Sequence, residues 1–138
     1  MKLNVSLDPL PGESIADLLA LVGKPARVQI LTVIGEQEAC VCHLEAALGL
    51  RQASISQHLM VLRKGGLVTA HRDGRNIFYR LTNPELAALL DQISQFVGGD
   101  RAEMKRLARR PVEGCCCPQC NPDLDPRLAC KPNKTGKT

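Results

Sequence analysis

Four cysteines lie within six residues in the stretch EGCCCPQC, at Cys115, Cys116, Cys117 and Cys120. Cysteine thiolates bind soft metal ions and also carry redox chemistry. Cys117 and Cys120 have the C-x-x-C spacing that is common among the ligands of tetrahedral sulfur sites. Residues 115–130 contain five of the seven cysteines of the chain, which favours metal or metalloid binding over unspecific scavenging thiols.

A second close pair, Cys40 and Cys42, lies in the stretch EACVCHL. The first residues, MKLNVSLDPLPGES, contain no apolar run of the kind that a secretory signal needs, and no later stretch approaches the roughly 18 apolar residues of a membrane span. We therefore expect a cytoplasmic protein without a membrane partner. In a reducing cytosol, clustered cysteines favour metal binding or redox chemistry over structural disulfides.

The hydrophobic pattern predicts the elements that must position these thiols, and 138 residues suffice for one domain with a tail. Apolar residues at helical spacing predict four helices before residue 67, which end at Gly23, Gly35, Gly49 and Gly65. A three-residue turn separates the third helix from the fourth. The period then alternates, and LVTAHR and RNIFYRLT flank Asp73 and Gly74, a pair suited to the tight turn of a β-hairpin.

Two further helices are expected after the hairpin. Asn83 can cap the first of them, whose apolar stripe from Leu86 to Phe96 needs a partner surface. Asp100 can cap a short basic helix that runs through Arg110. From Pro111 onward the tail shows no periodicity.

The fourth helix has a polar face that suits contact with DNA. If Ile55, Leu59 and Leu62 face the core, short polar side chains lie on or beside the opposite face, namely Gln52, Ser54, Ser56, Gln57 and His58. Such side chains can approach base edges in the major groove, and Arg63 at the margin can hold a phosphate. Residues 51–82 carry six basic side chains and one acidic side chain, with Arg75 at the hairpin tip. The pattern predicts a DNA-binding winged helix-turn-helix, with an ordinary solvated helix face as the alternative.

The blocks GKPARVQIL, CVCHLEAALGL, ASISQHLMVLRKGGLV and GRNIFYRL resemble successive motifs of the ArsR/SmtB family of metal-sensing repressors. The resemblance implies a mainly α-helical, dimeric winged helix-turn-helix protein whose first and last helices pair the subunits. It implies a repressor without enzymatic activity or organic substrate, which a ligand releases from double-stranded operator DNA. The expected division is an arm over residues 1–12, a DNA-binding and dimerisation domain over residues 13–97, and a basic helix with a cysteine-rich metal-binding tail over residues 98–138.

The resemblance also implies that Cys40 and Cys42, at the start of the third helix, are metal ligands. Glu45 stands where the best-known arsenic sensors have a third cysteine, and the stretch PELAALLDQISQFVGG holds no histidine of the kind that the zinc and nickel sensors use. Residues 1–39 hold no cysteine, unlike the amino-terminal arm of the cadmium and lead branch. We therefore expect the tail to complete the site.

Two ligand sets stay open. Cys40, Cys42, Cys117 and Cys120 would form a four-thiolate site for Cd(II), Pb(II) or Zn(II), whereas Cys115 or Cys116 with Cys120 would belong to a three-sulfur cup for As(III) or Sb(III). The alternative function is a persulfide or oxidant sensor of the same fold. A thiol oxidoreductase is disfavoured, because the C-x-x-C of such enzymes opens a helix after a strand, whereas the C-x-x-C of this chain lies in a proline-rich tail. We interpret His43 as a polar helix residue, with an auxiliary ligand role as the alternative, and His71 as a wing surface residue.

Overall fold

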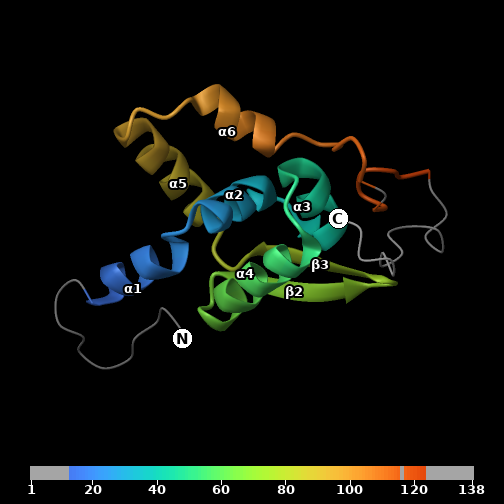
Figure 1. Cartoon of the computed structure of the whole chain (residues 1–138), viewed down its shortest axis with the longest axis horizontal. Coiled ribbons are helices and arrows are strands. Elements are labelled where there is room, and N and C mark those ends of the chain that lie inside the picture. Colours follow the sequence, from blue (N-terminus) through green and yellow to red (C-terminus); the bar gives the residue numbers. More distant parts are fainter. Residues whose placement is uncertain (1–12, 116, 124–138) are drawn as a thin grey trace.

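The computed structural model describes residues 13–115 and 117–123. The elements before the hairpin are α1 (Glu13–Val22), α2 (Pro25–Ile34), β1 (Ala39–Cys40), α3 (Val41–Leu48) and α4 (Gln52–Lys64). The hairpin strands are β2 (Val68–Asp73) and β3 (Asn76–Leu81), followed by α5 (Glu85–Phe96) and α6 (Arg101–Leu107) (Figure 1). This order confirms the predicted winged helix-turn-helix, mainly α-helical with a β-hairpin wing.

The core forms where the predicted apolar faces meet. Ile55, Leu59 and Leu62 of α4 are at most 1% exposed, and they belong to one cluster with Ile30 and Leu31 of α2. Burial of each such side chain is worth about 1.5–3 kcal/mol, so this contact determines where α4 sits. The opposite face of α4 is thereby left toward solvent.

The three strands form an antiparallel sheet in the order β1-β3-β2. Asp73 still pairs with Asn76, so the hairpin loop consists of Gly74, with a φ of 62°, and Arg75. The turn predicted at Asp73 and Gly74 is therefore displaced by one residue. Strand β1 was not predicted, because two residues are too short to show an alternating pattern.

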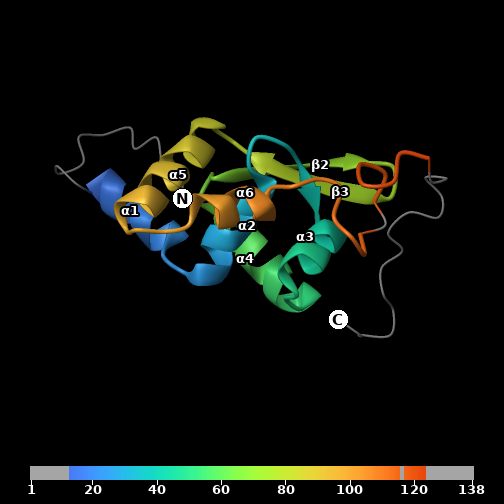
Figure 2. The same ribbon diagram turned by 90° about the horizontal axis from the view of Figure 1, so that it is seen from above.

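The two predicted capping residues after the hairpin, Asn83 and Asp100, accept hydrogen bonds at the starts of the helices that follow them. Asn83 Oδ1 accepts a hydrogen bond from the Glu85 amide at 3.0 Å, and Asp100 Oδ1 accepts one from the Ala102 amide at 2.8 Å. Helix α6 ends at Leu107, short of the predicted end at Arg110. Beyond α6 the chain runs back beside α3 and β3, as Figures 1 and 2 show from two directions.

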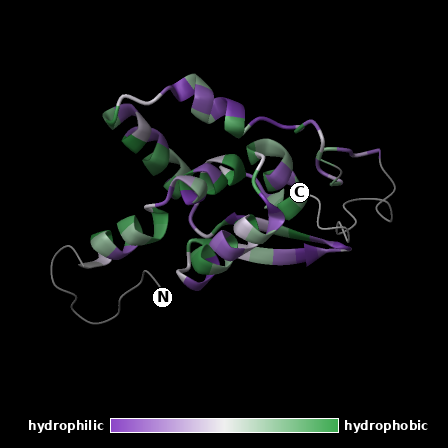
Figure 3. Cartoon of the chain, viewed as in Figure 1, coloured by the Kyte–Doolittle hydropathy of each residue, from purple (hydrophilic) through white to green (hydrophobic). Residues whose placement is uncertain are grey.

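Helices α1 and α5 leave large hydrophobic side chains on the surface. Ile15 is 64% exposed on α1, and Phe96 is 91% exposed at the end of α5. Figure 3 shows hydrophobic residues on both helices, which lie at one side of the domain. Neither these nor the other helices in the described part of the chain are long and apolar enough to cross a bilayer.

Candidate functional site

The described part of the tail folds back against α3 and brings together four side chains of types that can bind a metal ion. The donor atoms of His43, Cys115, Cys117 and Cys120 all lie within 4.8 Å of one another, and all four residues are buried. His43 and Cys117 are no more than 1% exposed. The tail cysteines therefore meet a histidine of α3 in the interior of the chain.

Backbone hydrogen bonds shape the tail around these cysteines. The amides of Cys120 and Asn121 donate to the carbonyl of Cys117 at 3.2 and 3.0 Å, so the C-x-x-C segment is a tight turn. The side-chain amide of Asn121 donates to the carbonyls of Cys115 and Cys117 at 2.6 and 3.2 Å. The Val112 amide donates to Cys120 Sγ at 3.5 Å. The three sulfurs are thus positioned by the tail itself.

His43, which the sequence analysis interpreted as a polar helix residue with an auxiliary ligand role as the alternative, lies in this group. Its Nδ1 lies 3.2 Å from Cys120 Sγ, and its Nε2 is buried without a hydrogen-bond partner among the described residues. Buried polar atoms usually have a hydrogen-bond partner, so Nε2 is the polar atom of this histidine that the described residues leave unsatisfied. The signal in the sequence was the histidine directly after the C-x-C pair, in CVCHL.

The surroundings of the site shift the pKa values of its cysteines in opposite directions. Contact with Cys115 raises the pKa of Cys117, but contacts with Cys40 and His43 help to lower it, and the net pKa lies below its ordinary value. Burial raises the pKa of Cys120 to about 12. Burial lowers the pKa of His43, while contacts with Cys115 and Cys117 outweigh it and leave the net pKa raised.

Arg110 supplies a positive charge that sequence reasoning missed. Burial lowers its pKa and the neighbouring Cys120 and Cys117 raise it, with a net lowering. An arginine nevertheless stays protonated in proteins. The guanidinium donates to the carbonyls of Val33 and Glu38 at 2.9 and 3.0 Å, which ties the start of the tail to the end of α2. No spacing in the stretch RLARR indicates which of its arginines is half-buried beside the cysteines.

The structure places the two cysteines of the CVC motif differently. Cys40 is 3% exposed and belongs to a small cluster with Phe78 and the described tail cysteines. Cys42 is half-buried and packs at the edge of that cluster. Neither belongs to the four-donor group, and the fourth donor there is His43. Cys116 lies outside the described residues. The described cysteines are thiols rather than disulfides.

The donor set fits a soft metal ion. In a tetrahedral site with metal–sulfur bonds of about 2.3 Å, neighbouring sulfurs lie about 3.8 Å apart, so a separation of 4.8 Å between two of these donors would have to shorten by about 1 Å. Three thiolates and a neutral imidazole around a divalent ion leave one negative charge, which the guanidinium of Arg110 can offset. Only small adjustments would close this shell.

The predicted DNA-reading residues lie on α4 and at the hairpin tip. Ser56, Gln57, Arg63 and Arg75 are exposed, whereas Gln52, Ser54 and His58 are half-buried. His58 Nδ1 accepts a hydrogen bond from Arg27 Nε of α2 at 3.2 Å. Burial and then the charge of Arg27 lower the pKa of His58. This bond holds the imidazole neutral, with Nε2–H as its remaining donor.

Comparison with known proteins identifies the helix-turn-helix region. Residues 24–70 match the family model described as bacterial regulatory protein, arsR family. The chain is 35% identical over 96 residues to the biofilm growth-associated repressor of Agrobacterium fabrum. The aligned region covers 66% of this chain and 82% of the relative.

Solved structures agree with the fold. The transcriptional repressor BigR from Xylella fastidiosa superimposes with a TM-score of 0.58 at 34% identity, over 62% of this chain and 87% of that one. The cadmium metal-sensor CMTR from Mycobacterium tuberculosis superimposes with a TM-score of 0.53 at 35% identity, over 60% of this chain and 86% of that one.

Proposed function

This chain belongs to the ArsR/SmtB family of transcriptional repressors, which bind operator DNA, and we propose that a soft thiophilic metal(loid) ion releases this member from its operator. One observation carries the proposal: His43 and three tail cysteines converge in a buried group. We propose that the released genes serve resistance to the ion or its efflux.

The donor set favours a divalent ion over a trivalent metalloid. Cd(II) and Zn(II) accept three thiolates and an imidazole in tetrahedral geometry, and the charge of Arg110 suits such a site. As(III) and Sb(III) need only three sulfurs, which Cys115, Cys117 and Cys120 supply without His43. Pb(II) can use the same three thiolates. A need for His43 in ion binding would therefore indicate a Cd(II) or Zn(II) site. Ion binding that does not need His43 would indicate a three-sulfur site.

The position of the site connects it to α4, the helix that we propose contacts the operator. His43 lies on α3, which continues through Gly49 into α4. The cadmium metal-sensor CMTR has a similar fold at 35% identity, which supports a metal ion as the signal. A bound ion would supply bonds that join the tail to α3. Release requires that the ion favour the low-affinity form of the protein by the same factor by which it weakens DNA binding.

We also propose that the protein acts as a homodimer. The exposed hydrophobic side chains of α1 and α5 would be covered by the same helices of a second subunit, as an isologous contact requires. The relevant side chains are Ile15, Leu19, Ile93, Phe96 and Val97. In a two-fold dimer, each subunit then presents one α4 to one half-site of the operator.

Thiol redox sensing is the second candidate, because Cys117 has a lowered pKa and lies among other thiols. The deciding experiment uses the reduced full-length chain on an operator duplex selected from a random-sequence library. The duplex complex is titrated separately with Cd(II), Zn(II), Pb(II), As(III), peroxide and a persulfide donor, and bound ion is counted per subunit.

We expect release by Cd(II) at one ion per subunit. Release by As(III) alone would favour the three-sulfur cup. Release by peroxide or persulfide without any ion bound would establish the redox alternative. A complex that none of these agents dissociates would overturn the proposal.

A further inference from the structure

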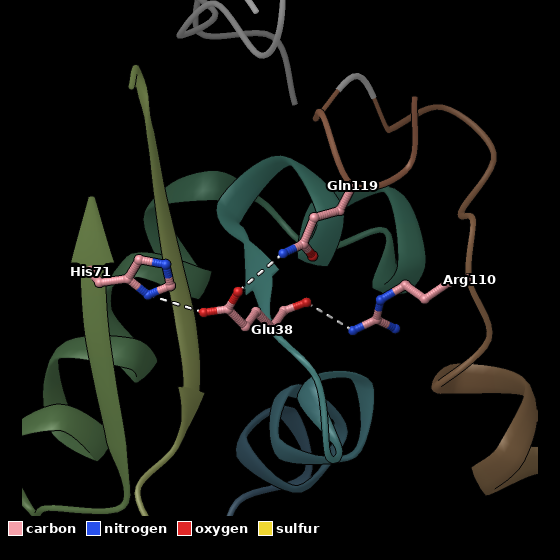
Figure 4. Close-up of polar contacts among 4 residues, drawn as sticks. All are labelled: Glu38, His71, Arg110 and Gln119. Atoms are coloured by element: carbon pink, nitrogen blue, oxygen red, sulfur yellow. Dashed lines mark hydrogen bonds and ion pairs between the residues drawn. The ribbon is translucent and has the colours of Figure 1, made fainter. Parts of the chain in front are cut away.

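One acidic side chain joins the tail to the wing. Glu38, in the loop between α2 and β1, lies with Oε2 3.0 Å from His71 Nδ1 on β2. Its Oε1 accepts a hydrogen bond from Gln119 Nε2 at 3.1 Å. Its carbonyl accepts the bond from Arg110 already described. Figure 4 shows these contacts, with Glu38 between the hairpin and the tail.

Gln119 occupies a special place in the tail, because it lies between two metal-binding side chains, Cys117 and Cys120. An ion bound by these donors would shorten any separation near 4.8 Å toward about 3.8 Å, and this tight turn carries two of the donors, Cys117 and Cys120. A hydrogen bond weakens steeply beyond about 3.5 Å. A displacement of Gln119 away from Glu38 by about 0.4 Å or more would therefore break their 3.1 Å hydrogen bond unless Glu38 moves with it.

The other end of this contact is in the DNA-binding hairpin. His71 is two residues from Asp73, where β2 ends, and Arg75 is in the loop. The ring of His71 also stacks on Phe78 of β3, with centroids 5.8 Å apart. Phe78 in turn packs among Cys40 and the described tail cysteines. Both hairpin strands thus contact the environment of the thiols.

The Glu38 contact is suited to differ between two states. The side chains of His71 and Glu38 are 47% and 27% exposed, so their pairing is screened by water and can break without disrupting the core. A contact that is equally strong in both states could not transmit a signal.

We infer that Glu38 is a positioning residue that couples the thiol site to the wing, so that ion binding shifts the hairpin as well as α4. This inference rests on the proposed function. It predicts two separable routes to the DNA, one through α3 into α4 and one through Gln119, Glu38 and His71 into the hairpin.

The test compares full-length Glu38→Ala with wild type, using Cd(II) as the probe. Three quantities are measured: Cd(II) affinity without DNA from thiolate-to-metal ultraviolet absorbance, operator affinity without ion, and operator affinity with ion. The ratio of the two operator affinities is the coupling factor. Glu36→Ala is the matched control, because Glu36 is an exposed acid of the same loop.

In Glu38→Ala, the Cd(II) affinity without DNA and the operator affinity without ion should each stay within about threefold of wild type. Its coupling factor should fall at least about threefold from a wild-type value in the range of about 5–150 that is typical of coupled sites. Glu38→Gln should restore coupling, because its oxygen can accept from Gln119 while its NH2 donates to the other tautomer of His71. Glu36→Ala should behave as wild type.

A double-mutant cycle tests the route itself. In an Arg75→Ala background the wing contribution is already reduced, so Glu38→Ala should lower the coupling factor by less than it does in wild type. A wild type that neither Cd(II) nor Zn(II), Pb(II) or As(III) releases would sink the proposed function. Normal release of wild type and Glu38→Ala alike would sink only the Glu38 inference, as would a loss of Cd(II) affinity in Glu38→Ala.

Discussion

His43 Nδ1 lies 3.2 Å from Cys120 Sγ, although 77 positions separate the two residues in the chain. This contact joins α3, the helix that precedes the proposed DNA-recognition helix α4, to the cysteine-rich tail. Removing the imidazole therefore tests whether the site binds a divalent ion through His43. His43→Ala should weaken Cd(II) binding at least about tenfold, since even partners in the outer shell of a metal site are worth about 10–100-fold. It should leave As(III) binding almost unchanged. His58→Ala is the control when both ions are titrated without DNA, and equal Cd(II) affinity of all three proteins would exclude His43 as a ligand.

The individual cysteines should differ in their effect on release. Cys117→Ser and Cys120→Ser should each abolish release by Cd(II) while operator binding stays intact, because a hydroxyl is a poor ligand for a soft ion. Cys42→Ser should retain release, since Cys42 lies outside the four-donor group. Operator titrations with and without Cd(II) measure both properties. If Cys40→Ser with Cys42→Ser abolished release and the tail variants did not, the site would belong to the CVC motif.

The recognition helix and the wing should read DNA in different ways. His58→Ala should weaken binding to the operator more than binding to random duplexes, because Nε2–H is placed to donate to a base edge. Arg75→Ala should weaken both and reduce the salt slope by about 0.9, the value of one phosphate contact. Fluorescence anisotropy over a range of salt concentrations separates the two outcomes. An unchanged operator preference in His58→Ala would remove that side chain from base readout.

The protonation of His58 should depend on Arg27. Burial and then Arg27 lower the pKa of His58, so the imidazole of the folded protein takes up a proton at a lower pH than an ordinary histidine does. Arg27→Ala removes the second cause, and the pKa should rise toward 6.5 without reaching it. Because the neutral form is favoured in the folded protein, the associated stability is present above pH 6.5 and is lost as the pH falls through the lower, folded-state pKa. NMR titration of the imidazole resonances measures the shift, and identical curves for both proteins would contradict it.

The hydrophobic ends of α1 and α5 should hold two subunits together. Phe96→Asp should raise the dimer dissociation constant by at least about 100-fold, because burial of each of two phenylalanines is worth about 1.5–3 kcal/mol and 1.4 kcal/mol is tenfold. Ile77→Asp is the control, since Ile77 is an exposed hydrophobic residue of the hairpin. Sedimentation at several concentrations gives the constants. A wild-type monomer at all concentrations would exclude this interface.

The sequence by itself determined the scaffold, because its signals are local. The spacing of Ile55, Leu59 and Leu62 predicts the buried face of α4, and Asn83 predicts the start of α5, since helical period and capping involve residues within a turn or two. The exposed polar face of α4 follows from the same periodicity. The hairpin was predictable to within one residue for the same reason.

Only the tertiary structure decided which side chains share the thiol site. Eighteen residues between Phe96 and Cys115 allow the tail to reach many surfaces, so no spacing in the chain selects His43 over Cys42. The choice is made by long-range contacts that leave no periodic trace. Arg110 binds the carbonyls of Val33 and Glu38, and Cys40 pairs with Phe78 through β1. These contacts direct the tail onto the side of α3 that carries His43.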